Sequence, residues 1–325
     1  MKKQTAFRFV FTALLCLVMA LGICSCDNTP DESEQTEAKY FKVTFNSAYG
    51  SHVSEQRVLE NEKASRPEDP VRNGYVFKSW QYKGTDWSFS HDKVTEDITL
   101  VATWEAADAV YVIENGYVTG CKQYFETMAV PSTNNGIDVV GIGDGAFADV
   151  DKGTVTKIIL PESVRAIGNN AFKDCSDIEI EVKGALTLVG ESAFEGCNGL
   201  SAVTFGNELN DIPFNAFKGC SSLKSVILPA SLTLISENAF EDCSSITYMV
   251  MHSSTITVEN NAFGGCDALK VLYYHGTEEQ LAQTSIASSN TAIEKAARFF
   301  YSKDKPTESG SFWHYDDSGK IKLWT

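Results

Sequence analysis

The dipeptide Ala-Phe recurs at nearly constant spacing, and this repetition limits the possible folds more than any other feature of the sequence. The phenylalanines follow one another at intervals of 25, 22, 23, 23 and 23 residues: Phe147, Phe172, Phe194, Phe217, Phe240 and Phe263. A period of about 20 to 29 residues is typical of solenoids, in which each repeat forms one coil and stacks on its neighbours. Residues 106–276 are therefore predicted to form a solenoid.

Other apolar residues keep a fixed distance from each phenylalanine. In five repeats a cysteine follows three residues later and leucine or isoleucine six residues later: Cys175, Cys197, Cys220, Cys243 and Cys266, then Ile178, Leu200, Leu223, Ile246 and Leu269. Two short strand patterns, such as residues 223–229 and 232–235, lead into the next Ala-Phe pair. One coil cannot bury these side chains alone, so stacking is expected to create the core.

This frame resembles the BspA-type leucine-rich repeat of bacterial cell-surface proteins, over residues 110–325. Residues 130–147 resemble the usual first unit, and residues 273–315 resemble the usual ending. The C-terminal cap, residues 277–325, is expected to contain a helix over residues 277–298 and then a hairpin that turns at residues 316–319. The resemblance implies a mainly β fold, a solenoid with short helical turns, and a binding protein displayed on a cell surface.

Residues 40–105 alternate apolar and polar residues in short runs that indicate β-strands. Three segments, residues 43–45, 74–77 and 95–104, resemble the internalin-type B-repeat, a β-grasp module of bacterial surface proteins. Asn61 stands where that family usually has glycine, and asparagine tolerates a left-handed backbone. Sugar stacking is conceivable for three tryptophans, although in so small a module we expect them to form the core: Trp80, Trp87 and Trp104.

The N-terminus has the three parts of an export signal: two lysines, an apolar stretch over residues 9–23, and Ile23-Cys24-Ser25-Cys26. The last four residues resemble a lipobox. Residues 1–25 are therefore predicted to be a lipoprotein signal peptide and Cys26 the lipidated residue, with a plain secretory signal as the alternative. Residues 26–39 are polar and acidic and are predicted to be a solvated tether.

The lipid on Cys26 is predicted to anchor the chain in a membrane of the cell envelope, with the outer membrane and surface exposure preferred. Asp27 also resembles an inner-membrane retention signal, so the choice between the two membranes stays open. Acidic residues outnumber basic ones by 43 to 27. Such a field repels phosphate groups, and we expect no nucleic-acid partner.

The cysteines and histidines form no recognised catalytic or metal-binding motif. Side chains one coil apart point the same way, which suits disulfides poorly, so the five repeat cysteines are predicted to be buried free thiols. Cys121 lies outside this ladder, and its state is left open. His252 and His275 stand 23 residues apart and are predicted to be neighbours on adjacent coils. A two-histidine metal patch there is the less favoured alternative, because it lacks a third ligand, and we expect no metal and no cofactor.

No nucleophile elbow, phosphate loop or dinucleotide fingerprint occurs in the sequence, and the two repeat regions leave no stretch for a catalytic domain. We therefore expect no enzyme activity and no catalytic residue. The preferred hypothesis is an adhesin-like lipoprotein that binds a host or neighbouring-cell protein or glycan. An architectural component of the envelope without an external ligand is the alternative.

The partner site is predicted on the sheet formed by the first strand of each repeat. An outward apolar stripe runs along this sheet and is the candidate site: Ile159, Ile227, Tyr248, Val250, Val271 and Tyr273. Exposed apolar surface usually marks an interaction site. The alternative explanation is that β-branched residues are simply favoured in strands.

Overall fold

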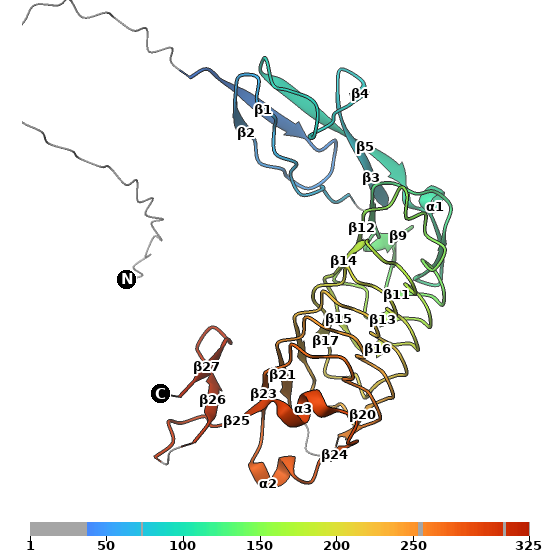
Figure 1. Ribbon diagram of the computed structural model, residues 1–325. Coiled ribbons are helices and arrows are strands. Elements are labelled where there is room, and N and C mark those ends of the chain that lie inside the picture. Colours follow the sequence, from blue (N-terminus) through green and yellow to red (C-terminus); the bar gives the residue numbers. More distant parts are fainter. Residues whose placement is uncertain (1–37, 73, 253–255, 308–309, 325) are drawn as a thin grey trace, which may run out of the picture. The chain divides into compact units, whose positions relative to one another are not determined.

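The computed structural model describes residues 38–72, 74–252, 256–307 and 310–324. The signal peptide, Cys26 and most of the tether lie outside these residues. Strands dominate the described chain and helices are short (Figure 1), which confirms the mainly β fold with a leucine-rich-repeat solenoid. No helix among the described residues is long and apolar enough to cross a membrane.

The N-terminal module is a five-stranded sheet in the order β2-β1-β5-β3-β4. Its strands are β1 (Tyr40–Asn46), β2 (Gln56–Leu59), β3 (Tyr75–Tyr82), β4 (Thr85–Asp86) and β5 (Ile98–Ala106). β1 pairs parallel with β5 and antiparallel with β2, as in a β-grasp module. Trp80 is buried, and Trp87 and Trp104 pack against the same cluster, so they belong to the core. Asn61 takes the expected left-handed backbone, with φ of 65°.

The Ala-Phe pairs form the centre of the solenoid. All six phenylalanine side chains are buried, and successive ring centroids lie 4.9, 5.2, 5.3, 5.2 and 5.0 Å apart in stacked orientation. The amide of each phenylalanine from 147 to 240 donates a hydrogen bond to the alanine carbonyl of the next coil. The dipeptide therefore supplies both the stacked ring and a backbone bond between coils.

The repeat cysteines are buried free thiols, as the sequence predicted. Each thiol donates a hydrogen bond to the phenylalanine carbonyl of the preceding coil, over 3.0 to 3.3 Å. A small side chain with a weak donor thus occupies each of these positions.

The second strands of successive coils form two separate sheets. One sheet contains β6 (Tyr111–Glu114), β7 (Tyr117–Cys121), β11 (Gly141–Ile142), β13 (Ala166–Ile167) and β16 (Leu188–Val189). The other contains β18 (Asp211–Ile212), β20 (Leu234–Ile235), β22 (Thr257–Val258) and β24 (Ser285–Ile286). β16 does not pair with β18. In the coils on either side, the amides of Gly190 and Ser236 donate a hydrogen bond to the preceding coil. The equivalent residue between them is Pro213, which has no N–H group.

The first strands are interrupted as well, so the single sheet expected from the sequence is wrong. One sheet contains β8 (Thr127–Ala129), β12 (Lys157–Leu160) and β14 (Glu179–Val182); the other contains β19 (Ser225–Ile227), β21 (Tyr248–Met251), β23 (Val271–Tyr274), β25 (Ala297–Tyr301), β26 (Phe312–Tyr315) and β27 (Ile321–Leu323). Between them, β17 (Thr204–Phe205) pairs with β15 (Ala185–Leu186). The interruption follows the repeat that is one residue shorter, because a single deletion shifts the strand register.

The cap contains two short helices, α2 (Glu278–Leu281) and α3 (Thr291–Lys295), in place of one helix over residues 277–298. β24 lies between them and pairs with β22, so this segment forms a last coil. The buried Asn290 side chain accepts a hydrogen bond from the Phe263 amide over 2.9 Å, where other coils offer a backbone carbonyl. The predicted hairpin is confirmed, with β26 and β27 antiparallel around the turn.

Three short elements complete the described chain. They are α1 (Ala107–Val110), which follows β5 directly, and the two-stranded sheet of β9 (Thr133–Asn134) and β10 (Ile137–Asp138). Val76 of the module packs into the core of the solenoid, so the two regions share buried apolar surface.

The Pro213→Ser variant tests the cause of the break between β16 and β18. A serine at this position restores the amide that Gly190 and Ser236 provide in neighbouring coils, and we expect this amide to bond to the Val189 carbonyl. Hydrogen exchange followed by NMR should show that the introduced serine amide is protected about as well as that of Ser236. If the introduced amide instead exchanges as fast as an exposed loop amide, proline is not what separates the sheets.

Candidate interaction surface

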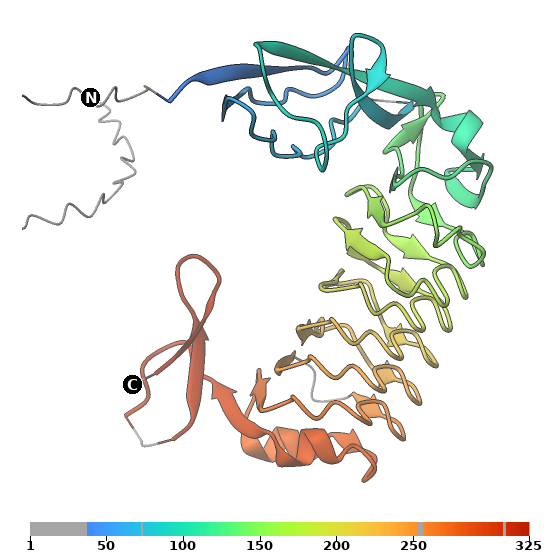
Figure 2. The same cartoon turned by 45° about the horizontal axis from the view of Figure 1, so that its top comes forward.

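The outward residues of the first strands make up one face of the solenoid, which we call the first-strand face (Figure 2). In β12, Ile158 and Leu160 are buried in the core, whereas Lys157 and Ile159 lie outward and are half-buried. The same alternation holds in β23, where Leu272 is buried and its neighbours point outward. The six predicted site residues all belong to this face, but their surroundings differ greatly.

Ile159 lies at the N-terminal end of the first-strand face and lines a cavity of about 300 Å³. Residues 66–69 of the module form the opposite wall. In the strand register Ile159 is next to Glu181, which the predicted stripe passed over. Lys157 Nζ lies 2.9 Å from Glu179 and 3.2 Å from Glu181, and these carboxylates raise the pKa of Lys157. The stripe is therefore interrupted by charged residues after Ile159.

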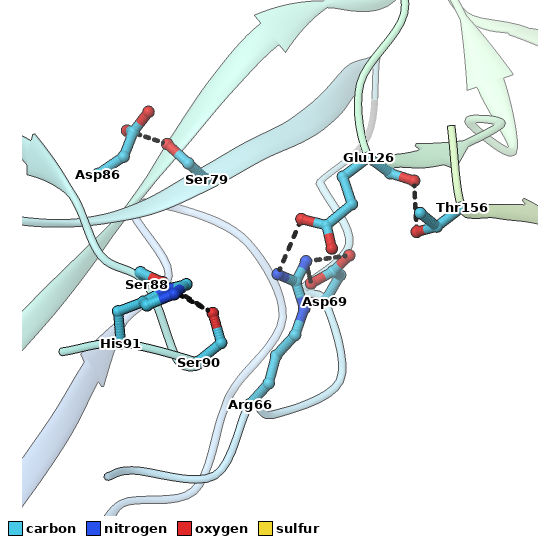
Figure 3. Close-up of polar contacts among 9 residues, drawn as sticks. All are labelled: Arg66, Asp69, Ser79, Asp86, Ser88, Ser90, His91, Glu126 and Thr156. Carbon is cyan, nitrogen blue, oxygen red and sulfur yellow. Dashed lines mark hydrogen bonds and ion pairs between the residues drawn. The ribbon is translucent and has the colours of Figure 1, made fainter. Parts of the chain in front are cut away.

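Polar contacts join the module's proline-rich loop to the first coil (Figure 3). Arg66 lies 3.1 Å from Asp69 and 3.8 Å from Glu126 of the solenoid. The Asp69 side chain is only 8% exposed, and burial raises its pKa more than Arg66 and a hydrogen bond from Thr127 lower it. The hydrogen bond from Thr127 to the buried Asp69 carboxyl connects this loop to the first coil, and the loop forms one wall of the cavity.

Ile227 is the most exposed of the predicted site residues, with 48% of its surface accessible. It lies on β19, the first strand of the second sheet, and Thr204 on the preceding coil is exposed as well. Among the described residues, this middle part of the first-strand face carries no ion pair. It is the region where an apolar side chain remains open to a partner.

The C-terminal end of the first-strand face is covered by the chain itself. Val250 points outward as predicted from the sequence, but it is fully buried, so its assignment as an exposed contact residue is wrong. Tyr248, Val271 and Tyr273 are half-buried. Trp313 on β26 explains this covering: it is fully buried, its ring centroid lies 5.6 Å from Tyr273, and its Nε1 donates to the Tyr274 carbonyl over 3.1 Å.

His252 and His275 are neighbours on adjacent coils, as predicted, with ring centroids 5.2 Å apart. Nδ1 of His252 lies 2.8 Å from the Leu228 carbonyl and must donate, so Nε2 accepts from the Tyr315 hydroxyl at 3.3 Å. His275 stacks on Tyr301 at 4.1 Å. Within the described ranges no group of three His, Cys, Asp or Glu residues is placed to hold a metal ion. The pair is part of the covering aromatic cluster.

Sequence reasoning missed the residues that shape both ends of the face. Trp313 and Tyr315 lie more than 60 residues after Val250, and Arg66 and Asp69 lie in another module. The two aromatic runs at residues 299–301 and 312–315 were the available signal, because such residues are favoured in strands.

Comparison with known proteins agrees with this architecture. Residues 140–270 match the family model of the BspA type leucine-rich repeat region in six copies, and residues 41–103 match the Listeria-Bacteroides repeat domain. The solenoid is a BspA-type leucine-rich repeat. Both resemblances drawn from the sequence are thereby confirmed.

Relatives of the BspA-type solenoid and its module cover only parts of the chain. A Gly-rich membrane protein of Evansella cellulosilytica is 35% identical over 72 residues, which are 21% of this chain and 8% of that protein. A leucine-rich repeat protein structure from Bacteroides ovatus is 29% identical, with a TM-score of 0.38, and covers 50% of this chain and 44% of that one. A leucine-rich cell surface protein from Faecalibacterium prausnitzii is 18% identical, with a TM-score of 0.38, and covers 66% of this chain and 58% of that one.

The aromatic side chains of β25 and β26 that pack around His252 and His275 should open more readily at acidic pH. Burial and the nearby His252 lower the pKa of His275 below its ordinary value of 6.5, and Tyr248, Tyr301 and Tyr315 complete the titratable groups around the pair. Folded His275 therefore binds protons less readily than His275 in the unfolded chain. Its contribution to the stability of the folded protein is present above pH 6.5 and is lost as the pH falls below that value.

Hydrogen exchange of residues 311–324, corrected for the intrinsic pH dependence of exchange, should show faster opening at pH 5.5 than at pH 7.5. The His275→Asn variant should lose most of this difference, whereas the control His52→Asn, in the N-terminal module, should keep it. Equal pH dependence in both variants would contradict the role of His275.

Proposed function

We propose that this chain is a non-catalytic binding protein of the cell envelope, which presents the first-strand face between Ile159 and Ile227 to a protein or glycan of a host or neighbouring cell. Ile227 is the observation that supports this most directly. Val250 on the adjacent coil is fully buried, whereas Ile227 is 48% exposed. Apolar side chains that remain open beside a polar rim are typical of interaction sites.

The cavity beside Ile159 adds specificity to this proposal. Its walls combine an apolar side chain with the cations of Arg66 and Lys157 and the carboxylate of Glu181. A partner that covers the isoleucine must also offer polar groups to these ion pairs, because charged groups are costly to desolvate. Mixed charge around an apolar centre favours a protein partner over a neutral glycan.

The proposed display on the cell depends on the N-terminal segment. Cys26 would carry the lipid that anchors the chain, preferably in the outer membrane, and the acidic tether would separate the folded part from the bilayer. BspA-type repeats are typical of cell-surface proteins, which agrees with this arrangement. An architectural protein without an external ligand would need the same anchor but no open face.

Replacing Ile227 tests the binding face. We expect Ile227→Ser to fold normally, since surface substitutions usually change stability by about 0.5 kcal/mol or less. Loss of a central contact of about 1.4 kcal/mol would weaken binding about tenfold. Adhesion of the purified protein to host cells and matrix proteins measures this effect.

The matched control is Ile137→Ser, because Ile137 is 59% exposed but lies on β10, outside the first-strand face. Equal adhesion of the two variants would place the partner site elsewhere. Protease treatment of intact cells adds an independent check, since a surface-displayed protein must be cut and a periplasmic component must not.

Replacing Cys26 tests the anchor. The Cys26→Ser variant has no thiol to acylate, so it should leave the membrane fraction, because an acyl chain contributes about 0.8 kcal/mol per buried methylene group. Cell fractionation and immunoblotting measure the change, with Cys121→Ser as the control cysteine. Membrane retention of the Cys26→Ser protein would show that another segment holds it there.

A further inference from the structure

The break between β16 and β18 exposes backbone groups that other coils use internally. In the coils before it, Arg165 O accepts the amides of Thr187 and Leu188, and Ile167 O accepts that of Gly190. The equivalent carbonyls one coil later are those of Thr187 and Val189. No N–H group among the described residues reaches either of these two oxygens, and Pro213 stands where the donor to Val189 would be.

The two coils nevertheless stay in contact at the break. Gly206 donates its amide to Leu186, Ser192 donates to Phe214, and the stacked rings of Phe194 and Phe217 keep their 5.3 Å spacing. The separation therefore affects only the outer surface formed by the second strands. It forms a hollow of about 410 Å³ between the two strands.

The charges that line this hollow have one sign. Three exposed carboxylates lie in its wall, and none of the lining residues is a lysine, arginine or histidine: the acids are Glu191, Glu208 and Asp211. Free carbonyl oxygens and carboxylates are all acceptors. The hollow thus has hydrogen-bond acceptors and negative charge but lacks the cationic donor that would match them.

An exposed apolar side chain lies among these acceptors, and an exposed aromatic one follows Pro213 in the sequence. Leu188 lines the hollow and is 55% exposed. Phe214 follows Pro213 and is 42% exposed, although the same position in other coils carries a polar residue: Asp144, Asn169, Glu191, Glu237 or Asn260. An exposed aromatic residue within an otherwise polar row indicates a contact rather than a requirement of the repeat.

We propose that this hollow is a second docking site, which receives an arginine side chain from an extended segment of a partner protein. The planar guanidinium offers five N–H donors and a fixed positive charge, which suits carbonyl and carboxylate acceptors together. Its aliphatic stem would lie on Leu188, as long cationic side chains do on apolar surface. A lysine, with a compact ammonium group, satisfies fewer of these acceptors at once.

The test uses the purified full-length protein and a synthetic nonapeptide with one central arginine between valine residues. Isothermal titration calorimetry gives the affinity, and NMR maps the site. We expect the Glu208→Gln/Asp211→Asn variant to bind the peptide at least tenfold more weakly than the unaltered protein. A peptide with citrulline in place of arginine should lose at least the same factor, because citrulline has the shape of arginine without its charge.

The matched control is Glu114→Gln/Asp267→Asn, which removes the same two charges at exposed positions away from the hollow. It should change the affinity by less than a factor of two, which separates specific docking from general attraction to an acidic protein. Chemical-shift changes should centre on residues 187–191 and 208–211. Equal affinity of the two double variants, or shift changes centred on the first-strand face, would overturn the proposal. Because Ile227 is unaltered throughout, failure here leaves the proposed binding face untouched.

Discussion

Stacking of one coil on the next is the constraint on which the rest of this structure depends. Each phenylalanine ring within the stack has another ring on both sides. Its amide donates a hydrogen bond to the next coil, and the cysteine thiol of each coil donates one to the phenylalanine carbonyl of the coil before. No coil satisfies its own groups, so both ends of the stack need a substitute. At the N-terminal end Tyr111 packs edge-on against Phe147, and at the C-terminal end the Asn290 side-chain amide takes the place of the missing carbonyl.

The sequence predicted what the repeat itself determines. Inward positions are set by the covalent spacing, so the phenylalanine stack, the cysteine ladder and the proximity of His252 and His275 followed from counting residues. The outward positions depend on what lies over them. Val250 fits the exposed pattern but is buried, and the aromatic residues that pack against its neighbours Tyr273 and His252 lie on a strand about 60 residues later. No local pattern carries that information.

Other failures have equally specific causes. Residues 277–298 contain helix-forming side chains, but pairing of β24 with β22 replaces the middle of the expected helix, since tertiary contacts override weak local propensity. Glu181 interrupts the apolar stripe because it stands in register beside Ile159 on the adjacent strand. The six predicted residues therefore lie on one face, but the structure gives them very different surroundings.

Pro213 shows how a solenoid acquires a site that its repeat does not encode. In a regular stack every strand edge is used by the next coil, and exposed edges occur only at the ends, where β27 is short and carries Lys322 as protection against unwanted pairing. A proline at an inter-coil donor position creates acceptors in the middle of the stack without a new loop or domain. The exposed carboxylates and Leu188 then determine which ligand these carbonyl acceptors favour. One substitution in the repeated sequence is therefore enough to turn a position that joins two coils into one that can bind a partner.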